Sequence, residues 1–168
     1  PVFQEFLLVP KEKTFSDNVK MMKKTYADIG KGLKTGKVND EGAWSANLND
    51  EEALKFLSEY SNIDIGVDIA ASSFYEDELY DYRIIERTQP AHIEHVVKLV
   101  KDYGIFYVED PLQEEDFEGF SEIKRLCREA LIVGDYLTAT HIDRLQRAIE
   151  NRSINAMIVK PNQNGSLL

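Results

Sequence analysis

Short apolar segments alternate along this chain with amphipathic segments of helical period, and the alternation restricts the fold. The apolar segments read as strands, and four of them are Ile63–Ala71, Ile105–Val108, Leu131–Val133 and Ala156–Val159. The segments between them place apolar residues three and four apart, which is typical of helices with one buried face. Strands that alternate with helices form right-handed βαβ units, so we expect an α/β fold with a parallel sheet.

The remaining segments complete this picture. A further strand is expected at Val2–Val9, before Pro10, and an irregular stretch from Lys31 to Asn49 reads as a long loop. Long loops in compact domains are often functional. The expected helices cover Phe15–Ile29, Asp50–Tyr60, Ala91–Asp102, Phe117–Glu129 and Ile142–Asn151.

A charged residue follows each of the four apolar strands. Asp68 comes directly after the apolar run Ile63–Val67 of the first segment. Glu109 and Asp135 come at the ends of the second and third, and Lys160 follows the fourth. The last three are spaced about 25 residues apart, which is the length of one strand, one helix and two short loops. About 40 residues separate Asp68 from Glu109, which leaves room for an excursion through Tyr75–Gln89. The carboxyl ends of parallel strands meet at one edge of the sheet, where α/β barrels place their active sites, so we expect these residues to converge.

Three converging carboxylates repel one another unless a cation neutralises them. Oxygen ligands favour a hard divalent ion, and Mg²⁺ suits this donor set better than zinc. Partial burial and the charge of the metal would both lower the pKa of a neighbouring Lys160, as a general base requires. A carboxylate at one strand end is more often a helix cap or a solvated loop residue, and that interpretation remains open for each acid taken alone.

Composition excludes several classes of function. The 168 residues predict one domain, and a formal net charge of −10 makes nucleic acid or an anionic membrane surface a poor partner. The chain contains no apolar run of the ~20 residues that a membrane helix needs. Its single cysteine, Cys127, cannot form an intramolecular disulfide and is expected on the buried face of a helix.

Six motifs resemble those of the enolase family, in the family's order and at similar spacing. They are "FQEF" at 3–6, "NDEG" at 39–42, "VDIAASSFY" at 67–75, "VEDPLQEEDFEGF" at 108–120, "IVGDYLTAT" at 132–140 and "IVKPNQNGSLL" at 158–168. The resemblance spans nearly the whole chain. It implies part of a TIM-type (β/α) barrel, the C-terminal domain of enolases, with about five of the eight strands present. "KPNQ" and "DEGAW" resemble the archaeal type.

The resemblance also implies an activity and a role for each matching residue. The activity is the magnesium-dependent, reversible dehydration of 2-phosphoglycerate to phosphoenolpyruvate. Lys160 matches the base that removes the C2 proton, and Glu41 matches the acid that assists departure of the C3 hydroxide. Gln4 and Glu5 match a pair that binds substrate and tunes the acid. The matched Mg²⁺ ligands are Asp68, Glu109 and Asp135. From the residues alone, Glu5 could face solvent at a sheet edge and Glu41 could be a turn carboxylate.

Several positions depart from the family pattern. Asn39, Ala43 and Trp44 alter the glycine-rich loop around Glu41, and Tyr136 follows Asp135 where a second acid is usual. The other departures are Ser73, His141, Asn164 and Ser166. Changes beside metal ligands can orient the ligands poorly and lower the affinity for the metal.

The resemblance further implies that residues 1–168 lack the family's N-terminal α+β domain, the first barrel strand and the last two strands. We therefore expect the chain alone not to dehydrate 2-phosphoglycerate, and we expect the full-length protein to be a cytoplasmic homo-oligomer. Two alternatives stay open: a non-catalytic enolase-like binding or assembly protein, and another enolase-superfamily enzyme that acts on a different carboxylate.

Overall fold

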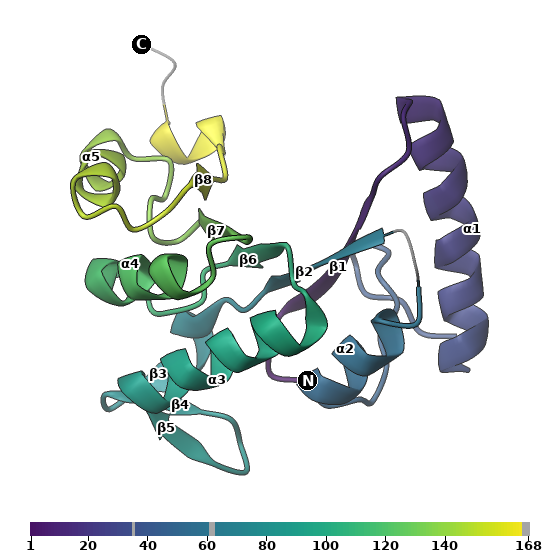
Figure 1. The fold of residues 1–168 in the computed structure, drawn as a ribbon, viewed down its shortest axis with the longest axis horizontal. Helices are drawn as coiled ribbons and strands as arrows, with labels where there is room; N and C mark the ends of the chain where they lie inside the picture. The colour runs from purple at the N-terminus through teal and green to yellow at the C-terminus, as the bar shows by residue number, and fades with distance from the viewer. Residues whose placement is uncertain (35, 61–62, 166–168) are drawn as a thin grey trace.

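A five-stranded sheet organises the molecule in the computed structural model, which describes residues 1–34, 36–60 and 63–165. The strands lie in the order β1-β2-β6-β7-β8 (Figure 1). Their bounds are β1 Glu5–Pro10, β2 Ile63–Asp68, β6 Tyr107–Glu109, β7 Leu131–Gly134 and β8 Ala156–Met157. The predicted α/β class is confirmed. Residue 35 of the expected long loop and residues 166–168 of the last motif lie outside the described residues.

The first strand runs against the others, so the prediction of a wholly parallel sheet was wrong there. β1 pairs antiparallel with β2, with Glu5 opposite Asp68 and Pro10 opposite Ile63, whereas β2, β6, β7 and β8 pair in parallel. The connection from β1 to β2 contains two helices, α1 (Phe15–Leu33) and α2 (Asp50–Leu57), instead of one crossover helix. As a result, the N-terminal end of β1 lies beside the carboxyl end of β2.

The helices lie close to their predicted ranges. α3 spans Gln89–Tyr103, α4 spans Phe117–Leu126 and α5 spans Ile142–Glu150. Local caps explain several starts: Asn49 and Glu52 form a capping box at α2, and Asp116 accepts a hydrogen bond from the Gly119 amide at α4. The α1 helix extends four residues beyond its prediction, to Leu33. It stops where Lys34 adopts a left-handed conformation with φ of 50°.

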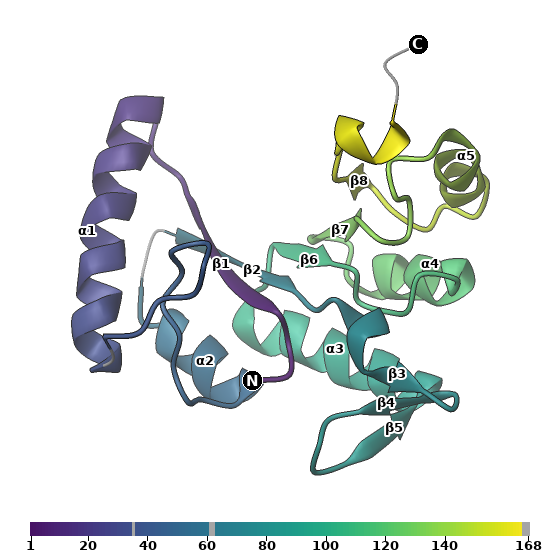
Figure 2. The same ribbon diagram turned by 180° about the vertical axis from the view of Figure 1, so that it is seen from behind.

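The core lies between the sheet and the helices α3 and α4, which cover one of its faces (Figures 1 and 2). Val67, Val108 and Ile132 contribute from the strands, and all three are buried. Cys127 is also buried, as predicted. Among the described residues, no helix is both long enough and apolar enough to cross a membrane.

The excursion between β2 and α3 forms a small separate sheet. After a 3-10 turn, Ala71–Phe74, its strands are β3 (Tyr75–Glu76), β4 (Leu79–Asp81) and β5 (Glu86–Thr88). The sequence predicted the excursion but not these strands, because none is longer than three residues.

A buried histidine fastens the small sheet to the central one. His92 is fully buried and stacks on Tyr80, with ring centroids 3.8 Å apart. Burial lowers the pKa of His92 to about 4, so the imidazole is neutral. The neutral ring accepts a hydrogen bond from the Tyr82 hydroxyl at Nδ1 (3.0 Å), and its Nε2–H donates to the Pro111 carbonyl (2.7 Å). His92 thereby links the small sheet to the segment that directly follows β6.

Candidate active site

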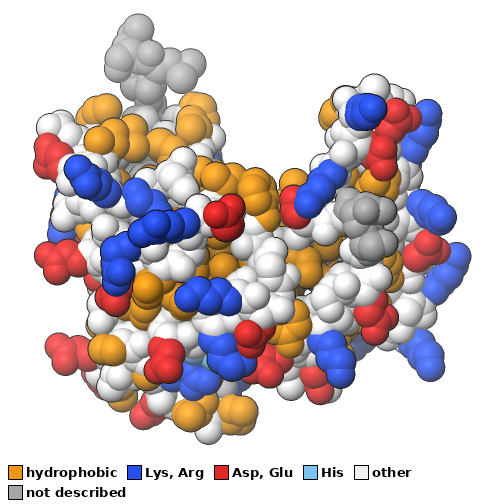
Figure 3. Space-filling model, in the orientation of Figure 1, with side chains coloured by type: hydrophobic (Ala, Val, Ile, Leu, Met, Phe, Trp, Pro, Cys, Tyr) orange, Lys and Arg blue, Asp and Glu red, His pale blue; other side chains and the backbone are white. Residues whose placement is uncertain are grey.

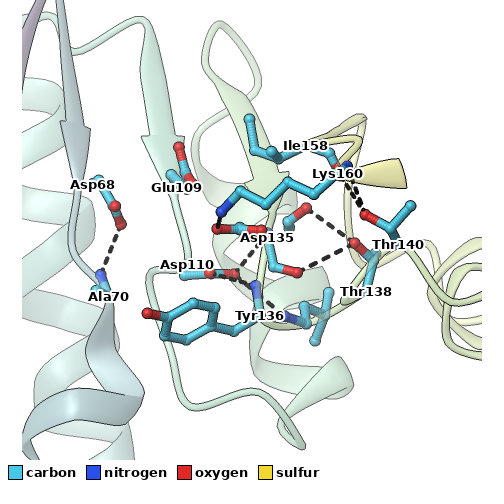
Figure 4. A network of polar contacts seen from close by, with 12 residues as sticks. Asp68, Ala70, Glu109, Asp110, Asp135, Tyr136, Thr138, Thr140, Ile158 and Lys160 are labelled. Atoms are coloured by element: carbon cyan, nitrogen blue, oxygen red, sulfur yellow. Dashed lines mark hydrogen bonds and ion pairs between the residues drawn. The ribbon is translucent and has the colours of Figure 1, made fainter. Parts of the chain in front are cut away.

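Three buried carboxylates lie at the carboxyl ends of neighbouring strands (Figure 4). Asp68 ends β2 and Glu109 ends β6, and the two residues are direct partners in the sheet. Asp135 directly follows β7. Their exposed fractions are only 8%, 9% and 5%. Carboxylate oxygens of Glu109 and Asp135 lie within 4.8 Å of each other. Asp68 lies beside Glu109 in the sheet but outside this close group, so the structure brings two of the three predicted acids into close contact and places the third next to them.

The electrostatics of this cluster fit a cation. Burial first, and then the charges of Glu109, Asp110 and Glu5, raise the pKa of Asp68 to about 7, although the Ala70 amide donates to its carboxylate at 3.0 Å. The Oδ1 atom of Asp135 is buried without a hydrogen-bond partner among the described residues. An orphaned buried oxygen within an all-oxygen donor set is what a hard divalent ion would satisfy.

A fourth acid, Asp110, joins the cluster and was missed by the sequence reasoning. Carboxylate oxygens of Glu109, Asp110 and Asp135 lie within 4.8 Å of one another, so the geometry alone would allow Asp110 to hold a metal. Its oxygens are already occupied, because they accept the backbone N–H groups of Asp135 (3.1 Å), Tyr136 (2.7 Å) and Leu137 (3.4 Å). Asp110 thus holds the loop that carries Asp135. The only sequence signal was a second acid directly after the acid at the strand end.

Tyr107 is a second residue that the sequence reasoning missed. Its hydroxyl donates to Glu109 Oε2 at 2.5 Å, which fixes one of the two carboxylate oxygens. The two residues are two apart on one strand, so their side chains share a face. The partner of Tyr107 in β2 is Gly66, where an added Cβ would approach the Tyr107 Cβ to 3.1 Å. The absence of a side chain at residue 66 leaves room for the tyrosine ring.

Lys160 reaches the cluster from the segment after β8. Its ammonium group pairs with Asp135, and its backbone N–H donates to Thr140 Oγ1 at 2.8 Å. The expected lowering of the lysine pKa depends partly on the charge of a bound metal, and it stays a prediction for the metal-bound site. The hydrogen bond to Asp135 raises the pKa of Lys160, and this effect outweighs the opposing effect of burial, since the side chain is 44% exposed.

The loop that carries Glu41 lies on the β1 side of β2, near the carboxyl end of that strand. Glu5 is half-buried opposite Asp68, whereas Glu41 is exposed in the loop between α1 and α2 and Gln4 is exposed just before β1. The pKa of Glu5 is raised by burial first, then by a side-chain hydrogen bond with Glu41 and by its charge. The structure therefore joins Glu5 and Glu41, which the residues alone had left as a possible edge residue and a possible turn residue.

Comparisons with known proteins agree with this geometry. Residues 2–168 match the family model described as the enolase C-terminal TIM barrel domain. The enolase of Thermoplasma acidophilum is 37% identical, over 98% of this chain and 45% of that protein. The enolases of Pyrobaculum aerophilum and Archaeoglobus fulgidus are 36% and 34% identical, over 100% and 98% of this chain and 44% of each protein. The chain spans a little under half the length of these curated relatives. It belongs to the enolase family, and its fold is part of that family's TIM barrel domain.

Proposed function

We propose that this chain carries the metal, acid and base groups of an enolase, which dehydrates 2-phosphoglycerate reversibly to phosphoenolpyruvate with Mg²⁺. The observation that carries the proposal is the placement of three buried carboxylates and a lysine along one edge of the sheet, with the Glu5–Glu41 pair beside them. By the same resemblance, we propose that turnover needs the remaining barrel strands and the N-terminal domain, and that the full-length protein is a cytoplasmic homo-oligomer.

Asp68, Glu109 and Asp135 would hold the ion. Bound Mg²⁺ would neutralise negative charge that builds on the substrate carboxylate as the C2 proton leaves. Two contacts of the chain prepare the ligands: Tyr107 orients the Glu109 carboxylate, and Asp110 holds the loop of Asp135. Such supporting contacts usually tune the affinity for a metal 10- to 100-fold.

Lys160 and Glu41 divide the proton transfers. The Lys160 amine removes the proton from C2, so it must first leave Asp135 and give up its own proton. Glu41 gives a proton to the C3 hydroxyl, the C3–O bond breaks, and water leaves. The hydrogen bond between Glu5 and Glu41 requires one proton shared between two carboxyl groups, and the raised pKa of Glu5 helps the pair to retain that proton.

The roles of base and acid can be separated by isotope exchange. In a polypeptide that contains this chain and the rest of the barrel, Lys160→Ala should abolish both exchange of the C2 proton with solvent and formation of phosphoenolpyruvate. Glu41→Gln should abolish only the second. Loss of exchange in Glu41→Gln would contradict the assignment.

A Mg²⁺ titration of the chain itself tests the non-catalytic alternative. A binding or assembly protein has no need of the ion, so an absence of affinity would favour that alternative. If the chain binds Mg²⁺ but exchanges the C2 proton of another carboxylate substrate instead, the chain is a different enolase-superfamily enzyme.

A further inference from the structure

The loop that carries Glu41 is a closed hairpin-like turn. The Ser45 amide donates to the Lys37 carbonyl at 3.0 Å, and the Asn39 amide donates to the Ala43 carbonyl at 2.9 Å. Val38 and Trp44 form an antiparallel bridge between these bonds. Glu41 lies at the tip of the turn, and Figure 2 shows the loop passing beside β1.

Asn39 fixes the turn from inside. Its side-chain oxygen accepts the backbone N–H groups of Glu41 (3.1 Å) and Ala43 (2.8 Å), and its own carbonyl accepts the Gly42 N–H (3.1 Å). Gly42 has φ of 80°, a conformation that suits glycine. Asparagine often stabilises turns by such local bonds to the backbone. The shape of the turn is therefore set by its own residues.

Trp44 fastens this turn to α1. Its ring stacks on Tyr26 with centroids 5.0 Å apart, and its Nε1–H donates to the Tyr26 carbonyl at 2.8 Å. The Tyr26 hydroxyl in turn donates to the Gly42 carbonyl at 2.7 Å. The indole also lies directly on Gly30, where an added Cβ would come 2.3 Å from Cζ2. No side chain larger than hydrogen at residue 30 is compatible with this docking.

The docked Trp44 side chain faces a largely apolar cavity. Trp44, Tyr26 and Ile29 line a cavity of about 270 Å³ together with residues of β1. Figure 3 shows a notch between the N-terminal part of α1 and the rest of the molecule, with hydrophobic side chains along it. Because this space is not filled, α1 touches β1 only sparsely, and the docked indole supplies a direct link between α1 and the turn.

We propose that Trp44 is a positioning residue for Glu41: by docking on Gly30 and Tyr26 it fixes where the turn stands and so holds Glu41 against Glu5. This inference rests on the proposed function of Glu41 as the acid. The turn is closed by its own hydrogen bonds but exposed, so contacts at its base that attach it to α1 help to fix its place beside β1. Holding the acid in place before substrate arrives removes an ordering step from the reaction.

The sequence offers a matched pair of variants to test the anchor. Gly30→Ala puts a methyl group where the indole lies, and alanine is the better helix former, so α1 itself should remain. Gly36→Ala is the control, since an added Cβ there meets none of the described residues within 4 Å. Trp44 is the only tryptophan of the chain, so its fluorescence and its indole N–H signal report on the anchor without further labelling.

In Gly30→Ala we expect the Trp44 emission to shift to the red and the amides of residues 39–43 to exchange roughly 10-fold faster or more, because a segment released from its packing opens more often. Gly36→Ala should match the parent in both readouts. Tyr26→Phe, which keeps the ring and removes the hydroxyl bond to Gly42, should give a smaller increase in exchange. An unchanged emission in Gly30→Ala, or a shifted emission with unchanged exchange at 39–43, would refute the proposal.

A catalytic readout separates this inference from the function on which it rests. In the polypeptide with the rest of the barrel, Gly30→Ala should slow formation of phosphoenolpyruvate roughly 10- to 100-fold, the effect of a misplaced catalytic group, while C2 proton exchange stays within about 2-fold. Equal loss of both would refute a role through Glu41. If the parent shows neither reaction, the proposed function fails, and the fluorescence and exchange results still decide whether Trp44 anchors the turn.

Discussion

Replacing Asp68 by Asn should stabilise the metal-free protein while it removes a metal ligand. The pKa of Asp68 is raised to about 7, against about 4 for an ordinary aspartate, because the carboxyl is buried among other acids. A difference of about 3 pKa units corresponds to roughly 4 kcal/mol between the two protonation states. Asparagine keeps the shape and the acceptor for the Ala70 amide but carries no charge.

The effect must depend on pH in one direction. Between about pH 4 and pH 7 the folded protein binds more protons at Asp68 than the unfolded chain does, so its stability is full below about pH 4 and falls as pH rises to about 7. Asp68→Asn lacks this loss. At pH 8 in EDTA we expect the variant to be more stable than the parent by about 2 to 4 kcal/mol, and at pH 4.5 the two should agree within about 1 kcal/mol.

Urea unfolding at both pH values, with EDTA or with excess Mg²⁺, measures these differences. Mg²⁺ should stabilise the parent and leave Asp68→Asn nearly unchanged. Asp64→Asn is the control, since this aspartate lies on the same strand but pairs with Lys11 at the surface, where a lost pair changes stability by less than about 1 kcal/mol. An Asp68→Asn protein that is less stable at pH 8 in EDTA, or a difference that does not vary with pH, would refute the reasoning.

Three further variants probe the contacts around the ligands. Tyr107→Phe removes the hydroxyl that donates to Glu109 and should weaken Mg²⁺ binding about 10-fold by calorimetric titration, with the fold unchanged; equal affinity would contradict the orienting role. Asp110→Asn replaces an acceptor of three amides by a group that presents N–H, so we expect a stability loss of about 1 to 3 kcal/mol together with weaker Mg²⁺ binding. Unchanged stability and unchanged Mg²⁺ affinity would contradict the role of Asp110 in holding the loop of Asp135. The pKa of His92 lies near 4 in the folded protein and near 6.5 in the unfolded chain, so its contribution of about 3 kcal/mol to the free energy of unfolding is full above pH 6.5 and is lost as pH falls towards 4. In urea unfolding, His92→Gln should lack this part of the pH dependence, and an unchanged dependence would refute the neutral buried state.

The strand ends could be predicted because their signal is local. Asp68, Glu109 and Asp135 each follow their own apolar run, and parallel pairing then places them together. The direction of β1 could not be predicted in this way, because it depends on how two helices and a long loop pack between β1 and β2.

The contacts that support the site join residues that are far apart in the sequence. Asp110 binds amides about 25 residues further along the chain, and no local pattern indicates which of two adjacent acids faces the site. The ion pair of Lys160 with Asp135 likewise joins the ends of two strands, and without a metal it raises the pKa of the lysine. Charge type and strand position were readable from sequence, whereas the partner of each charge was not.

The antiparallel pairing of β1 with β2 implies that two parts of the site form at different stages of folding. Asp68, Glu109, Asp135 and Lys160 come from strands that follow one another along the chain, so each pairing closes a segment of about 25 to 40 residues. Glu5 meets Asp68 only after about 60 residues have been closed into a loop, which includes the whole segment that bears Glu41. The entropy of closing this longer loop is less favourable by about 0.4 to 0.8 kcal/mol, and pairing over such a separation is slow. A refolding chain should therefore bring together Glu109, Asp135 and Lys160 before Glu5 pairs with Asp68.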